Sequence, residues 1–178
     1  MQAHEVASFW VSAGPKRWFA KDDAFDAEIR ARFKAVHLAA SRRELDGWAE
    51  TAEGALALVL LLDQVPRNIF RGSAHAFATD PLARQVARQA VERGFDAKVD
   101  AVLRQFFCLP FEHSEDLADQ DRAVALCEAS GDGDLLKWAQ IHRDIVVRFG
   151  RFPHRNAVLG RSTTREEQAF LDGGGFAG

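Results

Sequence analysis

Three groups of polar residues in this sequence combine the side chain types that carry out chemistry in proteins. They span residues 63–68, 109–116 and 148–156, and each contains a proline close to the end of a predicted helix. The groups supply carboxylates, imidazoles and guanidinium groups, which serve in proton transfer and in the binding of anions. The first hypothesis is therefore that the three groups meet in one pocket.

The candidate catalytic residues are His113, Glu115 and His142. His142 falls on the inward face of a predicted helix over residues 135–150, where it would act as an acid–base group paired with Glu115 or Asp63. The alternative is that a core-facing histidine bonds a backbone carbonyl or a carboxylate and only helps packing. Glu115 has its own structural alternative, because an acidic residue in the first turn of a helix stabilises the helix dipole.

The third group is rich in arginine. Arg148, Arg151 and Arg155 alternate with Phe149 and Phe152 in a predicted turn, and guanidinium groups beside aromatic rings are suited to bidentate binding of carboxylate or phosphate. We therefore predict a small anionic ligand. The candidate ligand-binding residues are Asp63, Gln64, Arg67, Asn68, Arg148, Arg151, His154, Arg155 and Asn156.

A metal site is an alternative use of the same side chains. His113, Glu115, His142 and His154 are all acceptable ligands for zinc or a harder divalent ion. Their spacing matches no strong metal motif, and the sequence contains no nucleophile motif, phosphate loop or dinucleotide fingerprint. We expect neither a metal nor a cofactor.

The element that must position the first group is an apolar stretch. Residues 55–62 contain no polar side chain, and a helix that is apolar on every side belongs in the middle of a bundle. Apolar residues at helical spacing, with caps and stop signals, recur elsewhere, and Thr163 to Glu166 has the pattern of a capping box. We predict an all-α fold, a bundle or an array of antiparallel helical hairpins with about seven or eight helices. It forms a single domain over residues 1–172, and 173–178 is a disordered tail.

Charge and composition limit the partners. The 23 lysine and arginine residues are outnumbered by 26 acidic residues and form no extended stripe, so no nucleic acid is expected. The N-terminus lacks the features of a signal peptide, and the longest apolar run is shorter than the roughly 20 residues of a membrane span. We therefore expect a cytoplasmic protein with no membrane partner.

Local charge is less even than the total. Residues 112–134 carry eight acidic side chains and one arginine, whereas residues 142–165 carry six arginines and one aspartate. Two such segments would pair through exposed salt bridges if they formed antiparallel helices, and bridges of this kind contribute little each. The structural alternative for the whole arginine group is that its members tie loops to helix ends.

Long motifs in the sequence resemble one family. LDQVPRNIFRG, FFCLPFEHSEDLADQDRAV and HRDIVVRFGRFPHRNAVLGRSTTREEQAFL are similar to the domain of unknown function 924 family, and the likeness extends from FWVSAGPKRWF at Phe9 to Leu171. The resemblance implies an all-helical fold of the TPR-like superfamily and implies no activity. Its TPR-like character makes a peptide or protein interaction module without catalytic activity the alternative to a small-ligand site.

Overall fold

The computed structural model describes residues 1–177 of the chain. They form helices, turns and connecting segments, with no strand among them, and this confirms the predicted all-α fold. The backbone groups into two compact units. Unit 1 comprises Met1–Arg71 and His75–Pro110, and unit 2 comprises Gly72–Ala74 and Phe111–Gly178.

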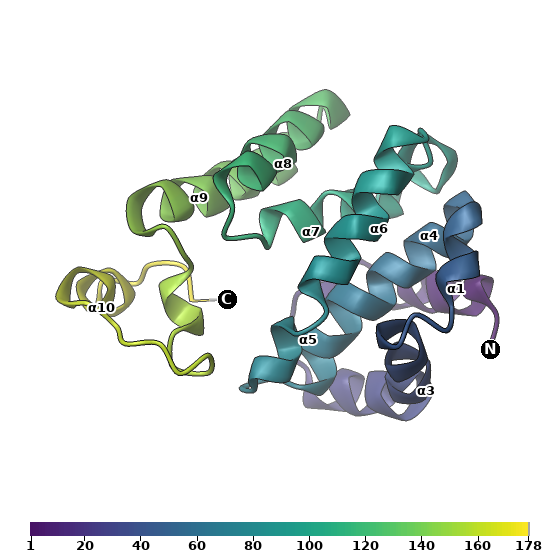
Figure 1. Cartoon of the computed structure of the whole chain (residues 1–178), viewed down its shortest axis with the longest axis horizontal. Helices are drawn as coiled ribbons and strands as arrows, with labels where there is room; N and C mark the ends of the chain where they lie inside the picture. Colours follow the sequence, from purple (N-terminus) through teal and green to yellow (C-terminus); the bar gives the residue numbers. More distant parts are fainter. Residues whose placement is uncertain (178) are drawn as a thin grey trace. The chain divides into compact units, whose positions relative to one another are not determined.

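Unit 1 contains six α-helices joined by shorter turns (Figure 1). The α-helices are α1 (Ala3–Ala13), α2 (Pro15–Trp18), α3 (Asp23–Ser41), α4 (Ala52–Val59), α5 (Val65–Ile69) and α6 (Asp80–Glu92). Its 3-10 turns span Asp46–Glu50, Asp96–Lys98 and Ala101–Phe107, and a π-helical turn, Leu60–Gln64, joins α4 to α5. The chain also forms the 3-10 turn Ala74–Phe77 and the short helix α7 (Leu109–Glu112).

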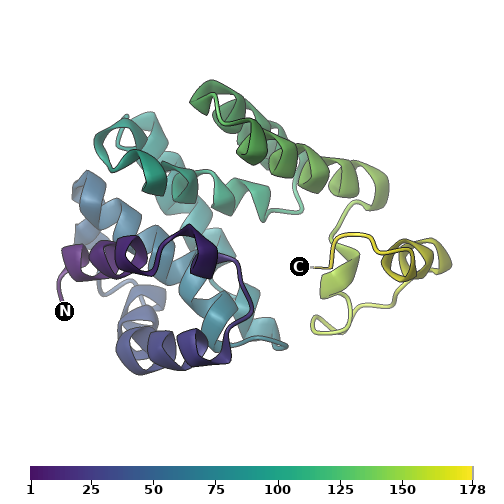
Figure 2. The same ribbon diagram turned by 180° about the vertical axis from the view of Figure 1, so that it is seen from behind.

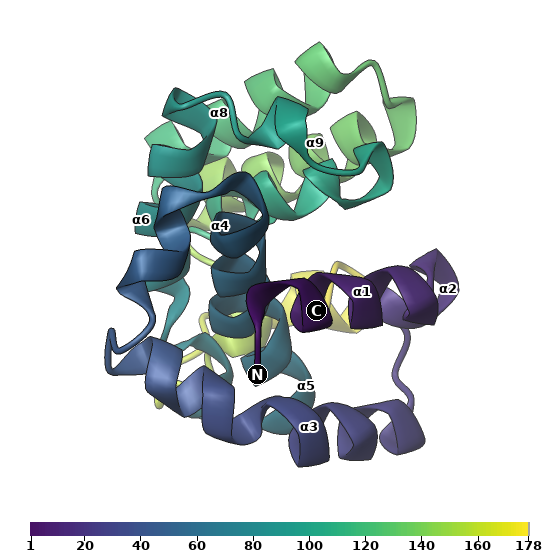
Figure 3. The same cartoon turned by 90° about the vertical axis from the view of Figure 1, so that its right-hand side faces the viewer.

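The apolar stretch at residues 55–62 is the core of unit 1, as predicted. Each of its side chains is at most 2% exposed. α4 packs against α1 and α6, and α5 packs against α3, as Figure 3 shows from the side. Neighbouring helices therefore cover the stretch, which is why it has no polar face.

The π-helical turn has a local cause in Pro66. A proline has no backbone N–H, so the helix cannot continue its hydrogen bonds across this residue. The Leu61 carbonyl instead accepts a hydrogen bond from His37 Nδ1 at 2.8 Å, and the Leu62 carbonyl accepts one from the Thr79 hydroxyl. Side chains from α3 and from the turn before α6 thus satisfy the carbonyls at the point where the first polar group begins.

Unit 2 is built on a helical hairpin. α8 (Leu117–Ser130) and α9 (Gly133–Phe149) lie side by side and run in opposite directions (Figure 2). The 3-10 turn Pro153–Arg155 and α10 (Arg165–Asp172) follow. Phe152 is fully buried beside Ile145 and Val146 of α9, so the turn that carries the third polar group is anchored in a small core.

The end of the chain follows α10 in a defined path. Gly174 has a positive φ of 78°, its N–H donates to the Leu171 carbonyl, and the Gly175 N–H donates to the Phe170 carbonyl. These are the two hydrogen bonds of a Schellman motif. The predicted disordered tail also includes residue 178, which lies outside the described residues.

No helix of residues 1–177 has the length and apolar character that crossing a membrane requires.

Candidate functional site

The first polar group lies in unit 1, where its side chains bond to one another and to two further acidic residues. Asp63 is fully buried; its carboxylate accepts a hydrogen bond from the Gln64 amide at 2.7 Å and lies 3.2 Å from the Arg67 guanidinium. Arg67 also binds Asp80 through two hydrogen bonds, of 2.8 and 3.0 Å. Asn68 donates to Asp26 of α3 at 2.7 Å.

Arg67 is thus the centre of a buried network with two carboxylates. Burial lowers the pKa of Arg67, but the charges of Asp63 and Asp80 outweigh burial, and the net pKa is raised. Arg67 Nη1 also donates to the Asp63 carbonyl oxygen at 2.7 Å, so Arg67 ties the π-helical turn to α6. This arrangement fits the structural alternative for Arg67, in which an arginine fastens one segment to another.

The second and third polar groups are both in unit 2, and Glu115 joins them. Its carboxylate accepts a hydrogen bond from the Phe152 N–H at 2.8 Å and two from Arg161, of 2.6 and 2.9 Å. Burial raises the pKa of Glu115, but hydrogen bonds from Arg161 and Phe152, with the charges of Arg161 and Arg155, bring the net pKa below its usual value. Glu115 therefore fixes the turn that carries His154 and Arg155.

His142 pairs with Glu112, a neighbour that the sequence did not single out. Its Nδ1 lies 3.0 Å from Glu112 Oε1 and 2.9 Å from the Trp138 carbonyl oxygen. A carbonyl oxygen can only accept, so Nδ1 carries a hydrogen, and in the neutral ring Nε2 is the basic nitrogen. Both side chains of the pair are 7% exposed, and the ring of His113 lies 6.5 Å from that of His142 between centroids.

His154 completes this cluster as a neutral imidazole. Burial, followed by the positive charge of Arg155 and smaller effects of His142 and His113, lowers its pKa to about 3. Its Nδ1 is buried and has no hydrogen-bond partner. Arg155 itself is 6% exposed and donates to the His113 carbonyl at 3.0 Å. We call Glu112, His113, His142, His154 and Arg155 the imidazole cluster.

The other predicted residues of the third group belong to a separate network in unit 2. Arg151 binds Glu167 through two hydrogen bonds, of 2.6 and 2.9 Å, and Asn156 also donates to Glu167. The hydrogen bond from Arg151 is the largest cause that lowers the pKa of Glu167 to about 2. Arg148 forms a more exposed pair with Glu166 at 3.1 Å. These arginines hold α10, whose capping box is Thr164 with Glu167, one residue later than predicted.

The geometry of the cluster does not favour the metal alternative. Within residues 1–177, no three of His113, Glu115, His142 and His154 bring ligand atoms within 4.8 Å of one another. A structural zinc site needs four ligands at about 2.0–2.3 Å from one ion, and this set does not provide them in the present arrangement.

Comparison with known proteins places the chain in a family. The model of a family described as a bacterial protein of unknown function, DUF924, matches residues 6–175. The chain belongs to this family. It is also similar to the solved structure of a protein of unknown function from Agrobacterium tumefaciens, with 56% identity, a TM-score of 0.93 and coverage of 96% of this chain and 97% of that one. No curated protein matches the chain.

Sequence reasoning on this DUF924 chain missed the partners of its predicted residues. Glu112 is only three residues from Glu115, and Arg161, Glu167 and Asp80 lie far from the residues that they bind. One signal was available: the six arginines of residues 142–165 are too many for one anion, which indicates that most of them need acidic partners within the fold.

Proposed function

We propose that this DUF924 protein binds a small anionic molecule at the imidazole cluster of unit 2, with His142 and Glu112 as a pair able to transfer a proton. The observation that carries the proposal is the buried Nδ1 of His154, which has no hydrogen-bond partner. A buried polar atom without a partner costs about 1–3 kcal/mol of stability. A ligand oxygen that accepts from this nitrogen would remove that cost.

The ligand's charge follows from the neighbours. Arg155 carries a buried positive charge close enough to lower the pKa of His154, and a neutral imidazole N–H donates to a carboxylate or phosphate oxygen. A cation would meet the guanidinium unfavourably. Arg148, Arg151 and Asn156 are engaged with Glu166 and Glu167, so in this proposal they support the site rather than contact the ligand.

The His142–Glu112 pair is the part of the site that could transfer a proton. A carboxylate that holds Nδ1–H orients the ring and leaves Nε2 as the base, which is the arrangement used in general acid–base catalysis. Glu115 has a lowered pKa and is held by Arg161, so we assign it a positioning role instead of proton transfer. Asp63, Gln64, Arg67 and Asn68 form the network of unit 1, and no ligand role is assigned to them.

We place the protein in the cytoplasm, which is supported by two buried cysteines, Cys108 and Cys127, in a chain poor in cysteine. The interaction-module alternative has less support. The TPR-like arrangement stays a prediction, and the large exposed apolar side chains of α9, Trp138 and Val147, are nine positions apart. They therefore point to opposite sides of the helix and form no continuous stripe.

The test is a titration with acetate and with inorganic phosphate, followed by NMR of the histidine rings. Binding should shift the signals of His142 and His154. Arg155→Gln and His154→Phe should each weaken binding about tenfold, because each removes one hydrogen bond to a charged oxygen. Arg143→Gln is the matched control, since Arg143 lies in the same unit and forms an exposed pair with Asp121.

Two variants are needed because Arg155 also donates to the His113 carbonyl, and its loss can disturb the fold. His154→Phe keeps an aromatic ring, removes both ring nitrogens and leaves the hydrogen bond from Arg155 to His113 in place. If neither anion shifts the two histidines at millimolar concentration, or if His154→Phe binds as well as the original chain, the proposed site is wrong.

A further inference from the structure

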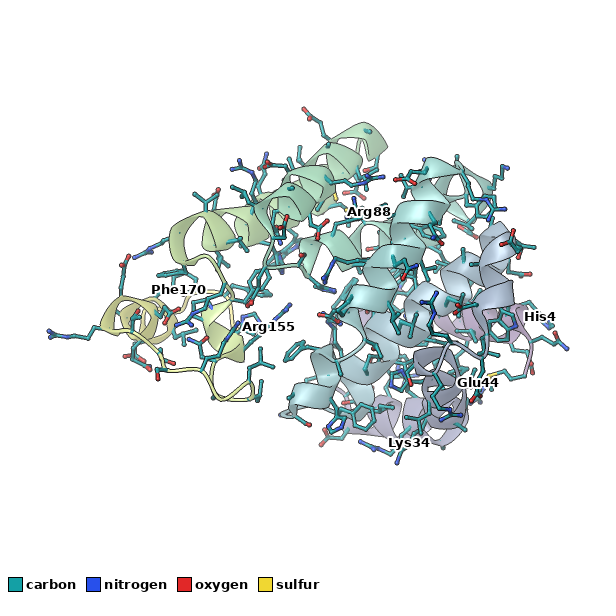
Figure 4. All side chains as sticks on the ribbon, viewed as in Figure 1. His4, Lys34, Glu44, Arg88, Arg155 and Phe170 are labelled. Atoms are coloured by element: carbon teal, nitrogen blue, oxygen red, sulfur yellow. The ribbon has the colours of Figure 1, made fainter. Side chains whose placement is uncertain are left out.

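The end of the described chain returns to the imidazole cluster. The Schellman motif after α10 reverses the direction of the backbone, and the path leaves no room for a larger residue than glycine at position 175. A Cβ there would lie 2.5 Å from the ring of Phe170, the residue on α10 that is labelled in Figure 4. The glycines at 173–175 therefore direct Phe176 to one defined place in unit 2.

That place is lined by aromatic rings. The Phe176 ring packs edge to face with His142, at 4.5 Å between centroids and 63°, and with His154, at 5.2 Å and 81°. It also lies 6.3 Å from the ring of Trp138, whose side chain is 49% exposed. Edge-to-face geometry at these distances is the favourable one for aromatic pairs, so the position fits a flat ring.

We propose that this position is the subsite for the ring of an aromatic carboxylate, and that Phe176 fills it when no ligand is bound. The inference rests on the proposed anion site, because the carboxylate would be held by His154 Nδ1 and Arg155. The three rings in contact with Phe176 include those of His142 and His154, two members of the imidazole cluster. The ligand's ring and charge would thus be recognised by adjoining groups.

Displacement of Phe176 by a ligand is physically reasonable. The contacts of Phe176 are with rings and with the apolar cluster around Ile145 and Phe152, and no charged pair depends on it. The ring is only partly buried. A ligand that places its own ring in the same position would replace most of the lost burial, while the glycines that precede Phe176 would let the segment move away.

The experiment compares benzoate with acetate, which have the same charge and differ in the ring. Dissociation constants would be measured by calorimetry, with the ring signals of His142 and His154 as the site-specific readout. Phe176→Ala should tighten benzoate binding about tenfold, because the subsite is then open, and should leave acetate binding unchanged. Phe19→Ala is the matched control, since Phe19 is a 62% exposed phenylalanine of unit 1.

A second variant, Gly175→Ala, tests the same displacement of Phe176 without changing Phe176 itself. Gly175→Ala should displace the segment through the clash with Phe170, and so should also tighten benzoate binding. If benzoate and acetate bind with equal affinity in all variants, the aromatic subsite is wrong and the anion site stands. If neither anion binds to the original chain, to Phe176→Ala or to Gly175→Ala, the proposed function itself fails, and the subsite fails with it.

Discussion

The chemistry of single residues in unit 2 is decided by neighbours that are distant in the sequence. His142 was predicted to pair with Glu115 or Asp63. In the fold, Glu115 binds Arg161 and the Phe152 N–H, and His142 binds Glu112. A helical wheel correctly predicts that His142 faces inward, where it is 6% exposed. It cannot predict which carboxylate meets the ring, because that depends on how separate segments fold together.

Glu115→Gln tests the positioning role. The change removes a charge that holds Arg161 and the turn before Pro153, and we expect a loss of about 1–3 kcal/mol in the free energy of unfolding. Because the folded-state pKa of Glu115 is lowered, its stabilising contribution is present above the ordinary glutamate pKa and is lost as the pH falls. Urea unfolding at pH 7 measures the difference.

The control for this variant is Asp121→Asn, which breaks the exposed pair with Arg143. Exposed pairs contribute about 0–1 kcal/mol, so Asp121→Asn should remain within roughly 0.5 kcal/mol of the original chain. Equal effects of the two variants would contradict the role assigned to Glu115.

At the scale of elements, the sequence predicts where helices occur better than it predicts their local geometry. The core helix at 55–62 and the helix predicted over residues 135–150, which is α9, follow from apolar residues at helical spacing. The sequence does not predict the π-helical turn Leu60–Gln64. The turn depends on His37 of α3 and Thr79 before α6, whose side chains donate hydrogen bonds to the carbonyls of Leu61 and Leu62. The glycine-rich composition of the tail indicates disorder. The Schellman motif at Gly174 and Gly175 could not be predicted from that composition, because it is defined by backbone angles and hydrogen bonds.

The start of α4 offers a sharp test of element packing. Gly54 lies in its first turn, and a Cβ at this position would lie 2.0 Å from the Trp48 carbonyl oxygen and 2.9 Å from the Thr51 hydroxyl that caps the helix. Alanine normally favours a helix over glycine by about 1 kcal/mol. Here the clash with the Trp48 carbonyl should outweigh this preference. We therefore expect Gly54→Ala to lower the free energy of unfolding by at least about 3 kcal/mol.

Gly47→Ala is the matched control for that variant. Gly47 lies in the neighbouring 3-10 turn, and nothing lies within 4 Å of a Cβ placed there. The Gly47→Ala protein should therefore have an unfolding midpoint in urea that is equal to or slightly above that of the original chain. A Gly54→Ala protein that is as stable as Gly47→Ala would show that α4 does not begin against Trp48 as described.

For the molecule as a whole, the sequence correctly predicts an all-helical chain of the DUF924 family, but it does not reveal how charge is used. Arg67 and Asp80 are 13 positions apart in the sequence, and Glu115 and Arg161 are 46 positions apart. The net charge of −3 conceals these pairs, since they cancel in the sum. The arginines expected to attract an anion are therefore largely neutralised inside the fold, whereas the imidazole cluster keeps a buried polar atom, His154 Nδ1, without a hydrogen-bond partner.

The pH dependence of stability follows from these networks. His154 has a folded-state pKa of about 3, whereas the ordinary pKa of histidine is 6.5. Between these two pH values the unfolded chain binds a proton at His154 and the folded chain does not. Its contribution to stability is complete above pH 6.5 and is lost as the pH falls towards 3, by at most about 1.4 kcal/mol per pH unit. Glu167, whose pKa is lowered to about 2 from 4.5, adds a second loss below pH 4.5.

We therefore expect the free energy of unfolding to fall by about 2 kcal/mol between pH 7 and pH 5 through His154 alone. His154→Gln should remove most of this fall, because glutamine does not titrate, and should leave the later loss below pH 4.5 in place. Urea unfolding followed by circular dichroism at pH 7, 6 and 5 measures both proteins. An equally steep fall in His154→Gln would mean that His154 is not held neutral by burial, and the argument for a ligand at its Nδ1 would lose its basis.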